Sequence, residues 1–319
     1  MLHLRLIVPA DRTDTAVDLI ERTVGTTHLV VLRGAARDPA GDVVLCDVAR
    51  EAGQELIRAL RELKIDQDGS IAVENIDLSL SNRATAAEEE APGEGADAVI
   101  WEQLTDATHE ESTLTITYSA FMILATMIAA CGVVLDNAIL IVGAMAVGPE
   151  FGPLAGICTG IVRRSPRLLL RSLIALLVGF AAAIVATTLF SLLMDGLDLF
   201  SVDQLDGKRP NTSFIWQPDP FSFVVALLAG AAGTLSLTST KSGALIGVAI
   251  SVTTVPAAAN AAVALSYGQY GQMWGSVEQL LLNLLGIVLA GTLTLYGQVL
   301  LWRTHRGRWT RKRRKNAAA

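Results

Sequence analysis

The chain has 319 residues, of which 51% are hydrophobic, and its mean hydropathy is +0.46. These values exclude an ordinary soluble globular protein and indicate a membrane protein. Charge divides the chain, because residues 1–111 hold 23 acidic and 10 basic side chains, whereas residues 112–319 hold 8 and 15. The first part is therefore predicted to be a water-exposed domain, and the second a membrane domain with basic loops.

The first predicted domain covers residues 1–81. Alternating and amphipathic patterns predict two helices and four strands, at residues 2–8, 11–24, 28–32, 43–48, 51–63 and 71–80. Their order, β-α-β-β-α-β, predicts an α+β ferredoxin-like domain in the cytoplasm. The basic stretch 33–37 is interpreted as a solvated hairpin connection. The start lacks the long apolar region of a signal peptide, so the amino terminus is expected to stay in the cytosol.

Residues 82–97 are small and acidic, with proline and glycine, and are predicted to be a flexible linker. Helical spacing resumes at residues 98–111, which are predicted to form an amphipathic helix at the membrane surface. The three cysteines form neither a CxxC pair nor a disulfide framework, and the four histidines are scattered. The sequence therefore predicts no metal site and no cofactor.

The membrane domain is predicted at residues 112–302. It holds six apolar segments, at about 114–135, 138–162, 168–194, 221–238, 242–267 and 277–302, each long enough to cross a bilayer. The basic residues of the loop at 163–171, Lys241 and the tail at 303–319 would lie on the side of the amino terminus. These features predict a multi-pass protein of the cytoplasmic membrane with both termini cytoplasmic. The basic run at 311–315 is interpreted as a topology anchor or lipid contact rather than a nucleic-acid site.

The second apolar segment contains residues that interrupt helices. Gly148, Pro149, Gly152 and Pro153 each disfavour a continuous helix. Glu150 adds a carboxyl group at membrane depth, and insertion scales put the free-energy cost of such a group at about 2.5–3.5 kcal/mol. A lipid-facing helix is not expected to carry these residues, so the segment is predicted to be broken and shielded by protein or water. We interpret it as a candidate binding site.

A weak internal duplication relates the second and fifth segments. Aligning Gly143 with Gly247, an offset of 104 residues, superimposes small and β-branched residues and brings Pro256 beside Pro153. Three spans in each half would make the halves an inverted 3+3 repeat. Corresponding interrupted spans in inverted halves indicate a binding site near the membrane midplane. Chance similarity between two stretches rich in Gly, Ala and Val is the alternative.

Polar residues within the spans complete the candidate ligand or ion pathway: Asn137, Gly148, Pro149, Glu150, Gly152, Pro153, Thr253, Thr254, Pro256, Asn260 and Asn283. Packing between helices is the alternative role for the hydroxyl-bearing residues. No lysine or arginine is predicted to pair with Glu150, so the group would be protonated, solvated by water or bound to a cation. Many small residues at helical spacing predict a tightly packed bundle and a homo-oligomer.

The run ATMIAACGVVLDNAILIVGAMAVGPEFGPLAG resembles the signature of an uncharacterised family of hydrophobic membrane proteins, domain of unknown function 389. The stretches ALLAGAAGTLSL, VAISVTTVPAAANAAVAL and LLLNLLGIVLAG are also similar to it. This resemblance covers about residues 112–302. The sequence departs from the family where Ser-Pro-Leu is usual and Gly148-Pro149-Glu150 stands here. The resemblance implies the membrane architecture and no established activity.

Three functions are considered. The first is a transporter or channel-like protein whose second and fifth spans form the site, with the cytoplasmic domain gating or assembling it. The second is a membrane-anchored sensor, whose amino-terminal domain binds a small cytosolic ligand while the spans serve oligomerisation. An intramembrane enzyme is the weakest hypothesis, because no nucleophile–base pair or acid cluster is visible. The expected partners are membrane lipid, a second copy of the chain and a small molecule or ion, with no nucleic acid.

Overall fold

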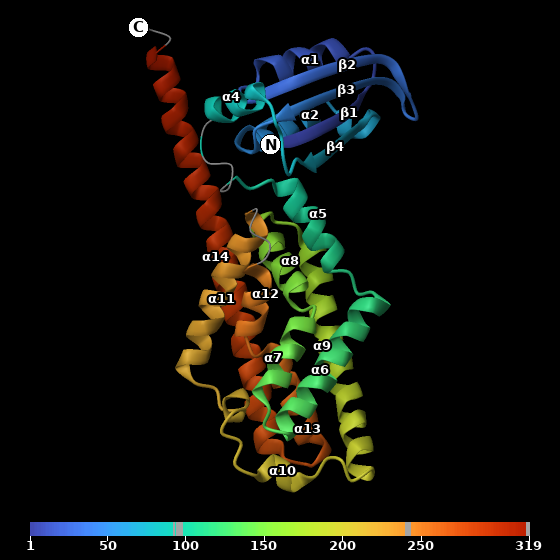
Figure 1. Ribbon diagram of the computed structural model, residues 1–319, viewed down its shortest axis with the longest axis vertical. Helices are drawn as coiled ribbons and strands as arrows, with labels where there is room; N and C mark the ends of the chain where they lie inside the picture. Colours follow the sequence, from blue (N-terminus) through green and yellow to red (C-terminus); the bar gives the residue numbers. More distant parts are fainter. Residues whose placement is uncertain (92, 94–97, 240–243, 317–319) are drawn as a thin grey trace. The chain divides into compact units, whose positions relative to one another are not determined.

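The computed structural model describes residues 1–91, 93, 98–239 and 244–316, apart from the side chains of 206, 244–246, 249 and 302–316. The chain divides into two units. One comprises Met1–Trp101 with Leu300–Ala319, and the other comprises Glu102–Val299. Figure 1 labels the elements of both.

The first unit is built on a four-stranded antiparallel sheet of order β2-β3-β1-β4. Its elements follow the predicted β-α-β-β-α-β order, with one additional short helix, α3. In chain order they are β1 (Leu2–Val8), α1 (Thr13–Arg22), β2 (Thr26–Arg37), β3 (Ala40–Val48), α2 (Arg50–Glu62), α3 (Ile65–Asp68) and β4 (Ser70–Asn75). The predicted last strand, 71–80, therefore ends early.

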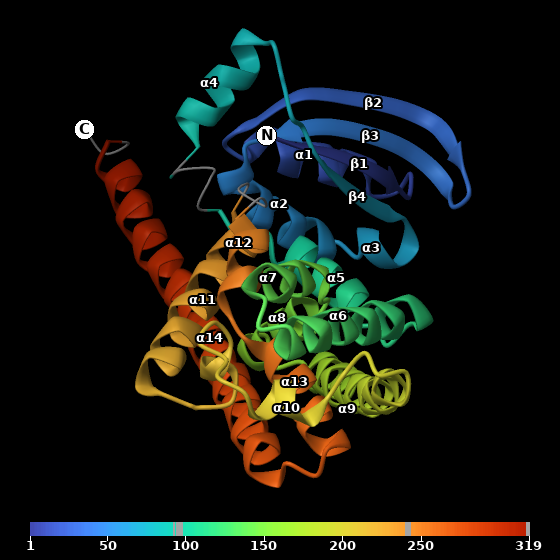
Figure 2. The ribbon, with the colours of Figure 1, turned by 60° about the horizontal axis from the view of Figure 1, so that its bottom comes forward.

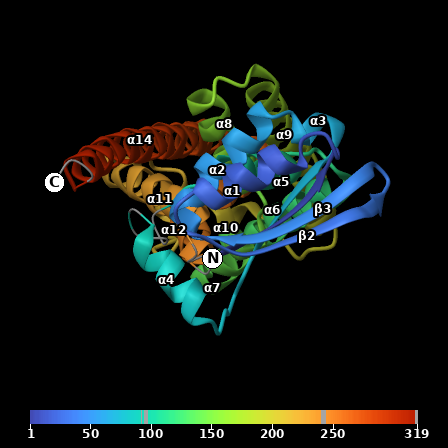
Figure 3. The ribbon, with the colours of Figure 1, turned by 90° about the horizontal axis from the view of Figure 1, so that it is seen from above.

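Helices α1 and α2 cover one face of this sheet (Figure 3). The side chains of β1 alternate, and Leu2, Leu4, Leu6 and Val8 are fully buried in the same cluster as the apolar residues of both helices. Alternation with a period of two places every second residue of a strand on one face, so β1 supplies the centre of this core.

Two stretches of the first unit differ from the sequence prediction. The basic residues 33–37 belong to β2 rather than to a hairpin connection. The predicted linker begins with a helix, α4 (Asn82–Glu90), because Ser81 caps it by accepting a hydrogen bond from Ala84 N and the run that follows is rich in Ala and Glu. The rest of the linker, except positions 91 and 93, lies outside the described residues.

The second unit is helical. Its elements are α5 (Trp101–Glu111), α6 (Ile116–Val134), α7 (Ala138–Val147), α8 (Phe151–Val162), α9 (Pro166–Gly196), α10 (Val202–Asp206), the short η2 (Ser213–Ile215), α11 (Pro220–Thr238), α12 (Ala244–Ser251), α13 (Thr254–Ser266) and α14 (Tyr270–Asn316). Helix α5 begins in the first unit, and α14 continues into it.

Several of these helices are apolar enough to cross a membrane. Among the described residues, α6, α9, α11 and α14 are long enough alone, and α7 with α8 passes as a pair bent by 52°. Four or five spans are therefore supported, which indicates a membrane-spanning protein. The predicted fifth span, at residues 242–267, is not confirmed, because its described residues are divided into α12 and α13, and α13 alone is a shorter apolar helix.

The break between α7 and α8 follows from the local sequence. Gly148 ends α7 in an extended conformation, with φ −63° and ψ 128°. Proline disfavours the helical conformation of the residue before it, so Pro149 accounts for this geometry. Pro153 lies in the first turn of α8, where no backbone N–H is required. Pro256 occupies the corresponding third position of α13. Each helix thus restarts before its proline.

Helix boundaries recur in the second unit at one spacing of 104 residues. Helix α6 runs from 116 to 134, and α11 from 220 to 238. Helices α7 and α12 end at 147 and 251, α8 and α13 end at 162 and 266, and α9 and α14 begin at 166 and 270. The coincidence extends the weak sequence match at Gly143 and Gly247 to four pairs of helices.

Helices α6–α9 form the first set and α11–α14 the second, and packing between the two sets follows the same spacing. Cys158 of α8 contacts α14, where its Sγ lies 3.6 Å from the carbonyl oxygen of Val288. Ala262 of α13 contacts α9, where its carbonyl oxygen accepts a hydrogen bond from Thr188 Oγ1 over 3.3 Å. Positions 158 and 262 are 104 residues apart, and Figure 2 shows α13 beside α9. In each set, the helix that follows the break (α8 or α13) therefore packs against the last helix of the other set (α14 or α9).

Candidate functional site

Glu150 and Thr254 meet where the two broken helices are interrupted. Glu150 is 3% exposed and Thr254 is 1% exposed. Thr254 Oγ1 donates a hydrogen bond to Glu150 Oε1 over 2.8 Å. Among the described residues, Glu150 Oε2 has no hydrogen-bond partner. The two residues are 104 positions apart, so this hydrogen bond joins equivalent positions of the two sets of helices.

Gly148 gives the carboxyl group its space. A Cβ atom at this position would lie 2.4 Å from Glu150 Oε2 and 2.8 Å from Val255 Cγ2. Any larger residue would collide with one or both. Glycine at 148 thus lets the carboxyl group turn back over the break, which positions Oε1 against Thr254.

The break lies about halfway along the α7–α8 pair. Helix α7 has 10 residues and α8 has 12, which correspond to lengths of about 15 Å and about 18 Å at the rise of an α-helix. Because the hydrocarbon core of a bilayer is about 30 Å thick, a span centred on it would place Glu150 near the midplane.

Thr253 connects the second break to α14. Its Oγ1 accepts hydrogen bonds from Asn283 Nδ2 over 3.0 Å and from Gln279 Nε2 over 3.4 Å. Both amides are buried, and Gln279 Oε1 has no partner among the described residues. The second break is therefore surrounded by neutral polar groups.

Asn260 belongs to a second polar cluster farther along α13. Arg209, which is 6% exposed and belongs to the segment between α10 and η2, donates from Nη1 to Asn260 Oδ1 over 2.9 Å and from Nη2 to Gln272 Oε1 over 2.6 Å. Asn260 Nδ2 in turn donates to Ser276 Oγ over 2.7 Å. This guanidinium group thus bridges α13 and α14.

The other predicted site residues take different positions. Asn137 is exposed and caps α7, where its Oδ1 accepts hydrogen bonds from the backbone N–H groups of Ile139 and Leu140. Gly152 faces α5, since a Cβ there would lie 2.6 Å from that of Glu111. Pro149, Pro153 and Pro256 shape the two breaks. The structure therefore brings together Gly148, Glu150, Thr253, Thr254 and Asn283, and it leaves Asn137 at the helical hairpin.

Sequence reasoning missed Arg209 and three residues of α14. Gln272, Ser276 and Gln279, together with Asn283, are spaced by four, three and four residues and so form one polar stripe on a helix. That spacing could have been read from the sequence. The burial of Arg209 could not, because a lone arginine in a polar loop carries no signal of what it contacts.

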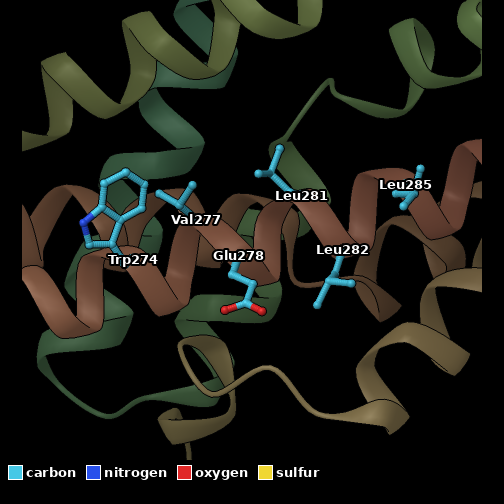
Figure 4. A pocket seen from close by; sticks show the side chains of 6 residues that line it. All are labelled: Trp274, Val277, Glu278, Leu281, Leu282 and Leu285. Carbon is cyan, nitrogen blue, oxygen red and sulfur yellow. The ribbon is translucent and has the colours of Figure 1, made fainter.

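A shallow groove on α14 is lined by Trp274, Val277, Glu278, Leu281, Leu282 and Leu285. Figure 4 shows that all six side chains come from this one helix. Trp274, Leu281 and Leu285 are 58–64% exposed. Exposed leucines on an apolar helix are typical of a lipid-facing surface, so this groove is not part of the candidate site. Among the described residues, no group of three His, Cys, Asp or Glu is placed to hold a metal ion.

These features define a membrane-spanning protein with a buried polar centre at the interruption of two helices. Residues 145–289 match the sequence model of a family described as a domain of unknown function (DUF389). This match confirms the family resemblance over that region, which includes both breaks. No solved structure matches the chain.

The chain is also similar to an uncharacterized protein of Methanocaldococcus jannaschii. The two are 26% identical over 203 residues, which are 64% of this chain and 61% of the relative. The match thus spans less than two thirds of the relative's length. Neither comparison carries a described activity.

Proposed function

We propose that this protein transports a small solute or ion across the cytoplasmic membrane, and that its site lies between the two breaks at Glu150 and Thr254. The observation that carries the proposal is their hydrogen bond of 2.8 Å, formed by two buried residues at equivalent positions. Intramembrane carboxyl groups usually face a bundle interior and mark ion or substrate pathways. Broken helices at corresponding positions of two halves are typical of secondary transporters.

The architecture proposed with this function has six spans arranged as an inverted 3+3 repeat. In it, α12 and α13 together form the fifth span, as α7 and α8 together form the second. Since each half then crosses the membrane three times, equivalent helices run in opposite directions. The common spacing of 104 residues supports this arrangement. The basic residues Arg163, Arg164, Arg167 and Arg171 support cytoplasmic termini.

Flux through proteoliposomes tests the transport proposal. Vesicles containing the full chain would be loaded with dyes sensitive to Na⁺, K⁺ or pH, and osmotic shock with amino acids, sugars and carboxylates would report solute entry. We expect a flux that Glu150→Ala and Thr254→Val abolish and Gly143→Ala retains, because a Cβ at 143 meets no atom within 4 Å. Absence of every flux, or a flux indifferent to Glu150 and Thr254, would reject the proposal.

The sensor hypothesis rests on a different observation. Asp47 of β3 holds two histidines, with His3 Nδ1 2.7 Å from its Oδ1 and His28 Nδ1 2.7 Å from its Oδ2. His28 Nε2 also lies 2.9 Å from Ser81 Oγ. These polar groups lie on the sheet face opposite α1 and α2. Hydrogen exchange of β1 and β3 in the full chain, with a panel of nucleotides and amino acids, would show ligand-dependent protection if this face senses a metabolite.

A further inference from the structure

We propose that Glu150 binds and releases a proton during transport, and that the proton reaches it from the side of the 207–219 segment along the polar stripe of α14. This inference rests on the proposed function and names the ion used at its site. It starts from the carboxyl group itself, which is buried and, among the described residues, is hydrogen-bonded through Oε1 alone.

The surroundings of Glu150 favour a proton over a metal ion. Tyr118 of α6 lies near Glu150, and Glu111 packs against the start of α8 at Gly152. Among the described residues, no lysine, arginine or histidine forms an ion pair with Glu150. An isolated buried charge is far more costly than a neutral carboxyl group. A proton removes that charge and, unlike a metal ion, needs no shell of oxygen ligands beside Oε2, which lies against Gly148.

The polar stripe of α14 leads from this carboxyl group toward the 207–219 segment. Asn283 and Gln279 contact Thr253, next to Thr254, and Ser276 contacts Asn260 farther along. Gln279 lies between Ser276 and Asn283 on this helix, is fully buried, and its Oε1 has no partner among the described residues. Buried amides and hydroxyls with unused hydrogen-bonding capacity favour transient water, and water chains carry protons.

Arg209 closes this route in the observed conformation. Its guanidinium group holds Asn260 and Gln272 together, and its positive charge disfavours entry of a cation beside it. The helices of the first set approach each other closely at the equivalent positions. Positions equivalent to Asn260 and Ser276 are Gly156 and Ser172, and a Cβ at 156 would lie 2.3 Å from Ser172 Oγ. Access on that side therefore requires the helices to move apart.

A hydronium ion on the side of the 207–219 segment gives a proton to the carboxylate of Glu150: one of its O–H bonds breaks, an O–H bond forms on Glu150, and a water molecule remains. After the helices rearrange, the O–H bond of Glu150 breaks and the proton forms an O–H bond with water on the opposite side, which leaves the carboxylate and a hydronium ion. The net change is the movement of one proton across the membrane.

Infrared spectroscopy of the full chain in liposomes tests this inference without a known solute. We expect a C=O band of a protonated carboxyl group at neutral pH that is lost in Glu150→Gln. In heavy water the band should shift, and Gln279→Leu should slow that shift. Thr187→Val is the matched control, because Thr187 is equally buried but lies on α9, away from the stripe. Ser276→Ala provides a second, smaller change on the stripe.

The outcomes separate the two proposals. Absence of the band at neutral pH, or its persistence in Glu150→Gln, would overturn the proton assignment. Equal exchange in Gln279→Leu, Ser276→Ala and Thr187→Val would overturn the route. A flux of Na⁺, K⁺ or solute that depends on Glu150 in a protein without the band would reject the proton and leave transport standing. The band without any flux would leave the proton assignment standing and reject transport.

Discussion

Two buried carboxyl groups, one in each unit, differ in what surrounds them. Asp42 is 4% exposed and Glu150 is 3% exposed. Each accepts a hydrogen bond at one oxygen, Asp42 from Gly34 N over 2.7 Å and Glu150 from Thr254. Each leaves its second oxygen without a hydrogen bond among the described residues. However, Arg33 Nη1 lies 3.7 Å from Asp42 Oδ2, whereas no lysine, arginine or histidine in the described part of the chain pairs with Glu150.

Burial alone therefore does not mark a functional carboxyl group in this protein. Asp42 secures an irregularity of the β2–β3 pair, where the register shifts between Leu32 and Ala36 and Gly34 adopts φ +64°. Its charge is compensated by an arginine that is 63% exposed to water. Glu150 lies in a helix break, where neither an arginine of the described residues nor contact with water compensates a charge. Asp42 is therefore explained as a group that stabilises the fold. Burying Glu150 costs free energy, and a binding function would explain why that cost is tolerated.

The largest expected effect comes from filling the space beside Glu150. Gly148→Ala would place a Cβ 2.4 Å from Oε2 and push the carboxyl group away from Thr254. We expect a destabilisation of about 1–3 kcal/mol, as for overpacked cores, and loss of any flux. Thermal unfolding in detergent measures the first. Gly143→Ala is the control, because it changes the same helix in open space and removes a glycine that costs ~1 kcal/mol relative to alanine. Equal stability of both variants would contradict the geometry at 148.

The second effect concerns the hydrogen bond across the two breaks. Thr254→Val keeps the shape of the side chain and leaves Glu150 Oε1 buried without its donor, which should cost about 1–3 kcal/mol. Thr254→Ser keeps the hydroxyl group and should retain most of the stability and flux. Denaturant unfolding of both variants provides the measurement. If serine were as harmful as valine, the methyl group rather than the hydrogen bond would be the important feature.

The smallest effect is expected at Asp42 and appears only in acid. The hydrogen bond from Gly34 N is the main cause that lowers the pKa of Asp42 below its ordinary value, and the charge of Arg33 also lowers it. A lowered pKa means that the carboxylate stabilises the folded unit above the unfolded value of about 3.9. This contribution is lost as the pH falls through the folded pKa. We expect amide-exchange protection of the β2–β3 pair to fall in that range.

Asp42→Asn should make that protection independent of pH over the same range, because an amide does not titrate. Glu74→Gln is the control, since Glu74 is an exposed residue of β4. An identical acid response in the wild type and Asp42→Asn would show that another group controls it, and the contrast with Glu150 would then lose its structural reference.

Local sequence determined much of this protein. Apolar length predicted the membrane-spanning helices, alternation predicted β1, and Gly148 with Pro149 predicted the break, because these signals act through the conformation of a few neighbouring residues. The match at Gly143 and Gly247 gave the spacing of 104 residues that the helix boundaries share. Sequence reasoning also selected Glu150, Thr254 and Asn283 as candidates, since polar residues are costly in apolar segments.

Which of these residues meet depends on how the helices pack. The contact of Glu150 with Thr254, the insertion of Arg209 between α13 and α14, and the role of Asn137 as a cap depend on how each helix is rotated and where it crosses its neighbours. Crossing points are set by small residues far apart in the chain, such as Gly230, whose Cβ would lie 2.5 Å from the carbonyl oxygen of Ile287. No pattern within a single segment contains that information, so the partners of its polar residues appear only once the helices are packed.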